Sequence, residues 1–131
     1  MTQNALWQLF RTRYGLVAAP QFALQSYSSD GQKDGLLRLT AIVATQGGTR
    51  QLEGQGNGLL SAAAHGLSRW VDAPFVIKDY HEHTLGERSD SRSVAYIRCL
   101  FQDGTSSWGV GIDGDVARAS LQALLNAVSR F

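Results

Sequence analysis

Three histidines and one cysteine carry the side chains best suited to bind a metal ion or to attack a substrate. His81 and His83 flank Glu82, and residues two apart on a β-strand project from the same face, so the two imidazoles could share a metal ion. The spacing is not the His-x-x-x-His of a helical zinc site, and no third ligand is clearly placed. His65 falls among alanines, as a packed or surface histidine does. We therefore predict no metal site.

The sequence also lacks a recognisable set of catalytic residues. Nothing next to Cys99 would activate its thiol as a nucleophile. Asp79 and Asp90 could pair as acid and base, but so could any two of the 11 acidic residues. We expect no catalytic residue and no cofactor here, and a small enzyme using Asp79 or His83 is the least favoured alternative.

A glycine-rich junction is better suited to bind a small anion. Gly54, Gly56 and Gly58 alternate, and Asn57 is placed to be the N-cap of a helix rich in leucine and alanine. We expect the strand to turn here with its backbone bare, so that free N–H groups at the helix N-terminus face an open space. Such a terminus attracts a carboxylate or phosphate. The simpler alternative is a plain strand-to-helix connection, since the motifs of nucleotide-binding loops are absent.

A second junction of the same kind occurs near the end of the chain. Gly109 and Gly111 are followed by a possible N-cap, Asp113 or Asp115, and by another helix rich in alanine and leucine. The two glycine pairs are 55 residues apart, which predicts a duplicated unit that ends in strand, turn and helix.

The segments between these junctions show the periodicity of strands and helices. Leu37, Leu39, Ala41 and Val43 alternate with polar residues, which predicts a sheet with one solvated face. The segment 92–102 is expected to place Val94, Tyr96 and Leu100 on one face. The predicted strands are 21–28, 36–45, 49–53, 75–83, 92–102 and 106–111, with loops at 28–35 and 85–91, and the predicted helices are 59–69 and 115–129. The order predicts an α+β fold of two pseudo-symmetric βββα units.

Composition limits the classes of partner. A chain of 131 residues fits one domain, and 44% hydrophobic with 18% charged residues is an ordinary globular balance. A net charge of +1 gives no reason to expect nucleic acid or an anionic membrane as a partner. The single cysteine excludes an intrachain disulfide, and no apolar run approaches a membrane span or a signal peptide. We expect a cytoplasmic location.

The first residues read differently from the rest. Leu6, Trp7, Phe10 and Tyr14 are three or four residues apart, which predicts a short helix over residues 4–14. The segment 15–20 breaks this pattern, so we predict that residues 1–18 are the remnant of a linker helix and residues 19–131 a separate domain.

Several blocks of sequence occur together in a known order. They are Gly-Gln-Gly-Asn-Gly at 54–58, Asp-Tyr-His-Glu-His at 79–83, Ala-Tyr at 95–96, Trp-Gly-Val-Gly-Ile at 108–112 and Ala-Ser-Leu at 119–121. Over residues 20–131 the chain resembles the C-terminal regulatory domain of 2-isopropylmalate synthases. The resemblance implies a homodimeric domain that binds L-leucine between its two units and thereby inhibits a catalytic TIM barrel, an acyltransferase with a divalent metal. It implies that this chain alone is not an enzyme.

The resemblance also implies a set of effector-binding residues. Matched by motif, these are Gly56, Asn57, Gly58, Leu60, Ser61, Ile77, Tyr80, Thr84, Ser91, Ile112 and Asp113. Leu59 stands where the family commonly has proline, and Ser61, Thr84 and Ser91 stand where alanine is common. Two alternatives stay open: an isoleucine-sensing domain like that of citramalate synthase, and a structural dimerisation module without a ligand.

Overall fold

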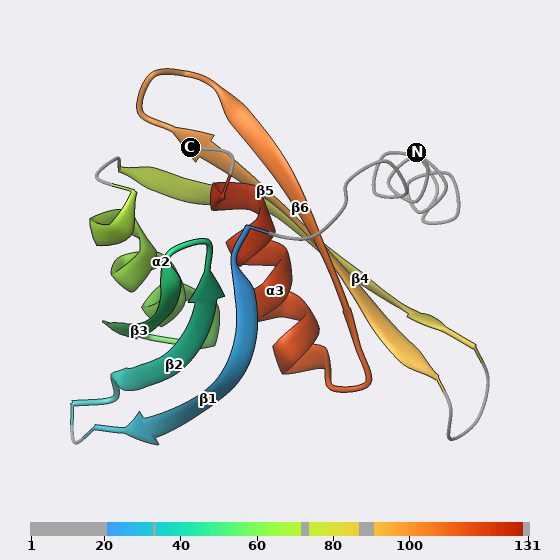
Figure 1. The fold of residues 1–131 in the computed structure, drawn as a ribbon, viewed down its shortest axis with the longest axis horizontal. Coiled ribbons are helices and arrows are strands. Elements are labelled where there is room, and N and C mark those ends of the chain that lie inside the picture. Colours follow the sequence, from blue (N-terminus) through green and yellow to red (C-terminus); the bar gives the residue numbers. More distant parts are fainter. Residues whose placement is uncertain (1–20, 33, 72–73, 87–90, 130–131) are drawn as a thin grey trace.

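Two consecutive βββα units make up the described part of the chain, as the sequence pattern predicts (Figure 1). The computed structural model describes residues 21–32, 34–71, 74–86 and 91–129. The predicted helix at 4–14, and the linker assigned to residues 1–18, lie outside these residues. The elements are β1 (Ala23–Gly31), β2 (Leu37–Thr45), β3 (Gly48–Gly56), α2 (Leu59–Trp70), β4 (Phe75–Leu85), β5 (Arg92–Phe101), β6 (Ser106–Asp113) and α3 (Val116–Val128).

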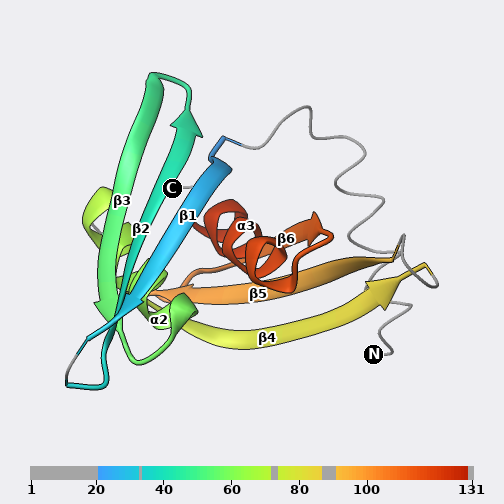
Figure 2. The same ribbon diagram turned by 90° about the horizontal axis from the view of Figure 1, so that it is seen from below.

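Each unit is an antiparallel three-stranded sheet followed by a helix that packs back onto it. The sheets have the strand orders β1-β2-β3 and β4-β5-β6. Helix α2 packs on β3, whereas α3 packs on β5 and β6 and also contacts α2 and β1 of the first unit. Helix α3 thus lies between β1 and the second sheet (Figure 2). Buried residues of both units belong to the same hydrophobic cluster, so the two units share a core.

Strand β2 confirms the predicted alternation. Leu39, Ala41 and Val43 are buried in the shared core, and Arg38 between them and the loop is exposed. A strand with one buried face and one more polar face shows this period of two.

Strand β1 is longer than predicted, and its pattern is interrupted. It continues to Gly31, so the predicted start of the loop at Ser28 is wrong. A bulge between Leu24 and Ser26 shifts the register, and Tyr27 therefore pairs with Ala41 on the core side. Strand β4 has a bulge at the equivalent place, between Ile77 and Asp79.

Strand β5 is buried on both faces, which the prediction of one apolar face missed. Ile97 and Cys99 belong to the shared core, whereas Val94 and Tyr96 form a second cluster with Val110 on the other face. A central strand enclosed on both faces reads as a continuous apolar run, and the sequence from Val94 to Ile97 has this form. Neither described helix is long and apolar enough to cross a lipid bilayer.

Candidate functional site

The alternating glycines of the first junction lie inside a strand, beneath a helix. Gly54 and Gly56 are part of β3, so the prediction of a bare turn at these residues is wrong. A Cβ atom on Gly54 would lie 1.9 Å from the carbonyl oxygen of Ala62, and one on Gly56 would lie 2.6 Å from Cβ of Ser61. The two glycines let the backbone of α2 approach β3 closely.

The second junction is built in the same way. Gly109 and Gly111 belong to β6, and a Cβ atom on either would lie 2.0 Å from a carbonyl oxygen of α3, that of Ala123 or Ala119 respectively. Both pairs of glycines therefore serve helix–strand packing.

The two units superpose with an offset of 57 residues at this point rather than the 55 predicted from the glycines. The helix N-caps Gly58 and Asp115 are 57 residues apart. Gly54 and Gly111 are also 57 apart, and both lie beneath a helix carbonyl. The counterpart of Gly109 is Leu52, and here the helix provides the glycine, because a Cβ on Gly66 would lie 2.7 Å from Leu52 Cδ1. A shift of two residues keeps the same strand face, which explains why the glycine pattern misled the alignment.

The two helices begin differently. The N-cap of α2 is Gly58 instead of the predicted Asn57, and no side chain caps its first turn. Asn57 accepts a hydrogen bond of 2.7 Å from the Ser61 hydroxyl at its Oδ1. The N-cap of α3 is Asp115, one of the two predicted residues, and it accepts a hydrogen bond of 2.9 Å from the backbone N–H of Ala117.

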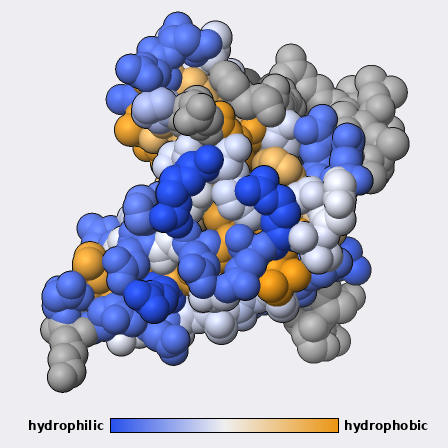
Figure 3. Space-filling view, turned by 60° about the vertical axis from the view of Figure 1, so that its left-hand side comes forward, coloured by the Kyte–Doolittle hydropathy of each residue, from blue (hydrophilic) through white to orange (hydrophobic). Residues whose placement is uncertain are grey.

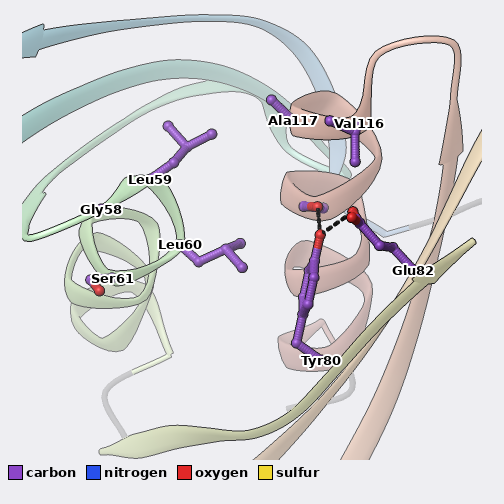
Figure 4. Close-up of a pocket in the computed structure, with 9 residues that line it drawn as sticks. Gly58, Leu59, Leu60, Ser61, Tyr80, Glu82, Val116 and Ala117 are labelled. Carbon is purple, nitrogen blue, oxygen red and sulfur yellow. Dashed lines mark hydrogen bonds between the residues drawn. The ribbon is translucent and has the colours of Figure 1, made fainter.

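An open hollow of about 400 Å³ lies between the N-terminus of α2, strand β4 and the first turns of α3 (Figure 4). Residues of both units line it: Gly58, Leu59, Leu60, Ser61, Tyr80, Glu82, Val116, Ala117 and Ser120. The side chain of Leu60 points across the hollow toward Tyr80. Seen from the side that bears α2, the surface is mostly hydrophilic, with apolar side chains showing between polar ones (Figure 3).

A small polar cluster stands at one wall of this hollow. The Tyr80 hydroxyl donates a hydrogen bond of 2.7 Å to Glu82 Oε2, and it lies 2.7 Å from the hydroxyl oxygen of Ser120. Burial raises the pKa of Tyr80 and the hydrogen bond to Glu82 acts in the same direction, so the phenol stays protonated at neutral pH. Opposite this cluster are apolar side chains and the first turn of α2, whose backbone N–H groups have no intrahelical partners. The hollow thus offers an acidic group, a hydroxyl, N–H donors and an apolar wall.

The structure brings several of the predicted effector-binding residues to this hollow. Gly58, Leu60, Ser61 and Tyr80 line it. The other residues implied by the family motif do not, although some lie close by in the fold. Gly56 and Asn57 immediately precede Gly58, Ile77 and Thr84 pair with β5 in the same sheet as Tyr80, and Ser91 directly precedes β5.

Two of the predicted residues point elsewhere. Ile112 pairs with Val94 on the face of the second sheet that is turned away from α3, and 43% of it is exposed. Asp113 forms an ion pair of 3.4 Å with Arg118. Neither lines the hollow within a single chain.

Five lining residues were not predicted as effector contacts: Leu59, Glu82, Val116, Ala117 and Ser120. Glu82 could have been found, because it is two residues from Tyr80 on a strand and therefore shares its face. The three residues of α3 could not, since only tertiary packing brings the second helix to the first junction.

The groups that sequence inspection considered for catalysis have structural surroundings instead. Asp79 is ion-paired with Arg98. His83 packs against Tyr96 with ring centroids 5.4 Å apart, and burial lowers its pKa. Cys99 is fully buried, and burial raises its pKa to about 12. Across the described segments, no three His, Cys, Asp or Glu side chains are grouped so as to hold a metal ion.

Comparison with known proteins matches the whole chain to a family described as the LeuA allosteric (dimerisation) domain, over residues 1–131. The 2-isopropylmalate synthase of Marinomonas sp. is 41% identical over 124 residues, which are 93% of this chain and 22% of that protein. The 2-isopropylmalate synthases of Rhodospirillum rubrum and Schizosaccharomyces pombe are 34% and 35% identical over 133 and 130 residues, which cover 100% and 93% of this chain. The chain spans 24% and 22% of these two relatives, so it corresponds to about a quarter or less of each relative named here.

Proposed function

Because the chain belongs to the LeuA allosteric (dimerisation) domain family, we propose that it is the domain through which L-leucine inhibits a 2-isopropylmalate synthase. The observation that carries this proposal is the hollow between the two units, which combines an apolar wall with polar groups suited to a free amino acid. The reaction, its TIM barrel and its divalent metal belong in this proposal to the remaining part of the synthase, in the cytoplasm.

The chemistry of leucine fits the groups around the hollow. Its volume of about 400 Å³ lies within the range of roughly 300–1,000 Å³ that is usual for small-ligand sites. Glu82 is an acidic partner for the ammonium group, and Leu59, Leu60 and Val116 provide apolar surface for the isobutyl group. The carboxylate is left for the N-terminus of α2, which favours negative charge.

The position of the hollow supports an allosteric role. Its walls come from α2 of the first unit and from β4 and α3 of the second, so a bound ligand contacts both units at once. A ligand of this kind stabilises the arrangement of the units that it contacts best, and it thereby shifts the equilibrium between arrangements. Feedback inhibition requires such a differential affinity.

The same proposal includes a homodimer, in keeping with the family description. Val76 and Ile112 are 54% and 43% exposed, and by their pairing with Leu100 and Val94 both lie on the face of the second sheet turned away from α3. Apolar residues exposed on one sheet face suit contact with a second copy. Sedimentation of the variant Val76→Asp, Ile112→Asp should show a monomer, and a dimer of unchanged stability would exclude this face.

Thermal unfolding of the chain with a panel of amino acids tests the effector assignment. Since a ligand at about 100 times its Kd stabilises by about 2.7 kcal/mol, L-leucine should raise Tm by several degrees and D-leucine should not. A rise with L-isoleucine alone would reassign the effector. A dimer whose Tm responds to no branched-chain amino acid would contradict the proposal and leave a structural dimerisation module.

A further inference from the structure

The two helix junctions are equivalent in the fold but different in their side chains. The N-caps Gly58 and Asp115 correspond, and the last strand residues Gly56 and Asp113 correspond, each two residues before its N-cap. The tyrosines of the edge strands correspond as well. Tyr27 follows the bulge in β1, as Tyr80 follows the equivalent bulge in β4.

The chain's own carboxylate fills the junction at α3. Asp115 Oδ1 accepts a hydrogen bond of 2.9 Å from the backbone N–H of Ala117, and Asp115 Oδ2 accepts one of 3.4 Å from the Tyr27 hydroxyl. The carboxylate therefore connects the helix N-terminus of the second unit to the edge strand of the first.

A cation completes this filled junction. Arg118 pairs with Asp113 at 3.4 Å and donates hydrogen bonds of 3.3 Å and 3.4 Å to the carbonyl oxygens of Leu24 and Gln25 in β1. Three charged side chains of the second unit thus hold β1 of the first.

The junction at α2 has the same framework without these side chains. The offset of 57 residues puts Gly56, Gly58 and Ser61 where the second unit has Asp113, Asp115 and Arg118. The hollow lies at this place, between the first turn of α2 and Tyr80. Two glycines and a serine in place of three charged residues leave both the space and the hydrogen-bonding positions open.

We propose that the carboxylate of the bound amino acid takes, at the α2 junction, the place that the Asp115 carboxylate holds at the α3 junction. It accepts a hydrogen bond from the backbone N–H of Leu60, the counterpart of Ala117, and lies beside the hydroxyl of Tyr80, the counterpart of Tyr27. The inference rests on the proposed function and adds the orientation of the ligand. It also sets a stoichiometry of one amino acid per chain, because Asp115 closes the other junction.

The variant Gly58→Asp tests this orientation by adding the missing carboxylate to the protein itself. The backbone of Gly58 is extended, with φ of −166°, and a Cβ atom there meets nothing within 4 Å, so the aspartate fits without strain. Gly31→Asp is the matched control, since it adds the same side chain where a Cβ also meets nothing within 4 Å, in β1 and away from the hollow. Isothermal titration with L-leucine measures affinity and stoichiometry for both variants and for the unaltered chain.

We expect the unaltered chain and Gly31→Asp to bind one leucine per chain, and Gly58→Asp to bind it about ten-fold or more weakly. Without ligand, Gly58→Asp should melt about 1–2 °C higher, because aspartate is a slightly better N-cap than glycine. Equal leucine affinity in the two variants would overturn the orientation and leave the proposed function standing. Two leucines per chain would also overturn it, as would binding of 3-methylbutylamine, which has no carboxylate, as tightly as leucine. If the unaltered chain binds no amino acid, the proposed function fails, and this inference fails with it.

Discussion

Replacing Gly54 by alanine tests whether the alternating glycines serve helix–strand packing. The added Cβ would lie 1.9 Å from the carbonyl oxygen of Ala62, 2.9 Å from the backbone nitrogen of Gly66 and 3.0 Å from the carbonyl carbon of Ala62. All three neighbours are backbone atoms, so no side-chain rotation relieves the overlap.

The magnitude follows from that overlap. A close carbon–oxygen contact is about 3.3 Å, so α2 has to move away from β3 by roughly 1.4 Å. Such overpacking costs about 1–3 kcal/mol or more, because buried Ala62, Ala63 and Leu67 lose contact with the sheet. Alanine offsets about 0.4–1 kcal/mol of this by restricting the unfolded chain. We expect a net loss of about 2 kcal/mol in the free energy of unfolding.

Urea denaturation measures this loss. With an m-value of about 2 kcal/mol/M, the midpoint should fall by about 1 M. Gly31→Ala is the control, because its Cβ would meet nothing within 4 Å, and its free energy of unfolding should stay within about 0.5 kcal/mol of the unaltered chain. If Gly54→Ala were as stable as Gly31→Ala, the explanation of the glycines would be refuted.

Two further predictions concern the shared core. Gln122→Ala should cost about 1–3 kcal/mol in urea denaturation, because the Gln122 side chain bonds the N–H of Leu24 at 2.9 Å and the carbonyl of Phe22 at 2.8 Å, and both would lose their partner; an effect equal to that of Gln102→Ala in the exposed turn would contradict this. Burial raises the pKa of Cys99 from 9.0 to about 12, so its thiol should resist iodoacetamide in the folded chain at pH 8, and alkylation as fast as in urea would contradict the burial. The folded state holds this proton more tightly than the unfolded state, so the stabilising contribution is complete below pH 9.0 and is lost as pH rises toward 12, by at most about 1.4 kcal/mol per pH unit, and Cys99→Ala should show a shallower decline.

The fold was predictable where local pattern and tertiary packing agree. The alternation around Leu39 and the apolar stripe of α3 identify a strand and a helix, and two such sets in the same order predict the duplicated units. The bulge at Leu24 was not predictable, because an extra residue in a strand leaves no clear mark in the apolar pattern. The glycines had two possible uses, a turn or close packing, and only the position of the helix distinguishes them.

The site was predictable in part for the same reason. Gly58 and Tyr80 lie in recognisable motifs, and both line the hollow. Ser120 and Val116 come to it only because α3 packs beside β4 and α2, a tertiary arrangement with no local signal. The offset of 57 residues, which sets Gly58 against Asp115, also required the structure, since glycines two residues apart on one strand face can be matched in either of two ways.

A crystal structure of the chain with L-leucine tests the central claim most directly. The account predicts leucine in the hollow between Leu60 and Tyr80, with its carboxylate at the first turn of α2 and its side chain against Leu59 or Val116. Leucine bound elsewhere while this hollow is empty, for example against Ile112 on the opposite face of the second sheet, would contradict it.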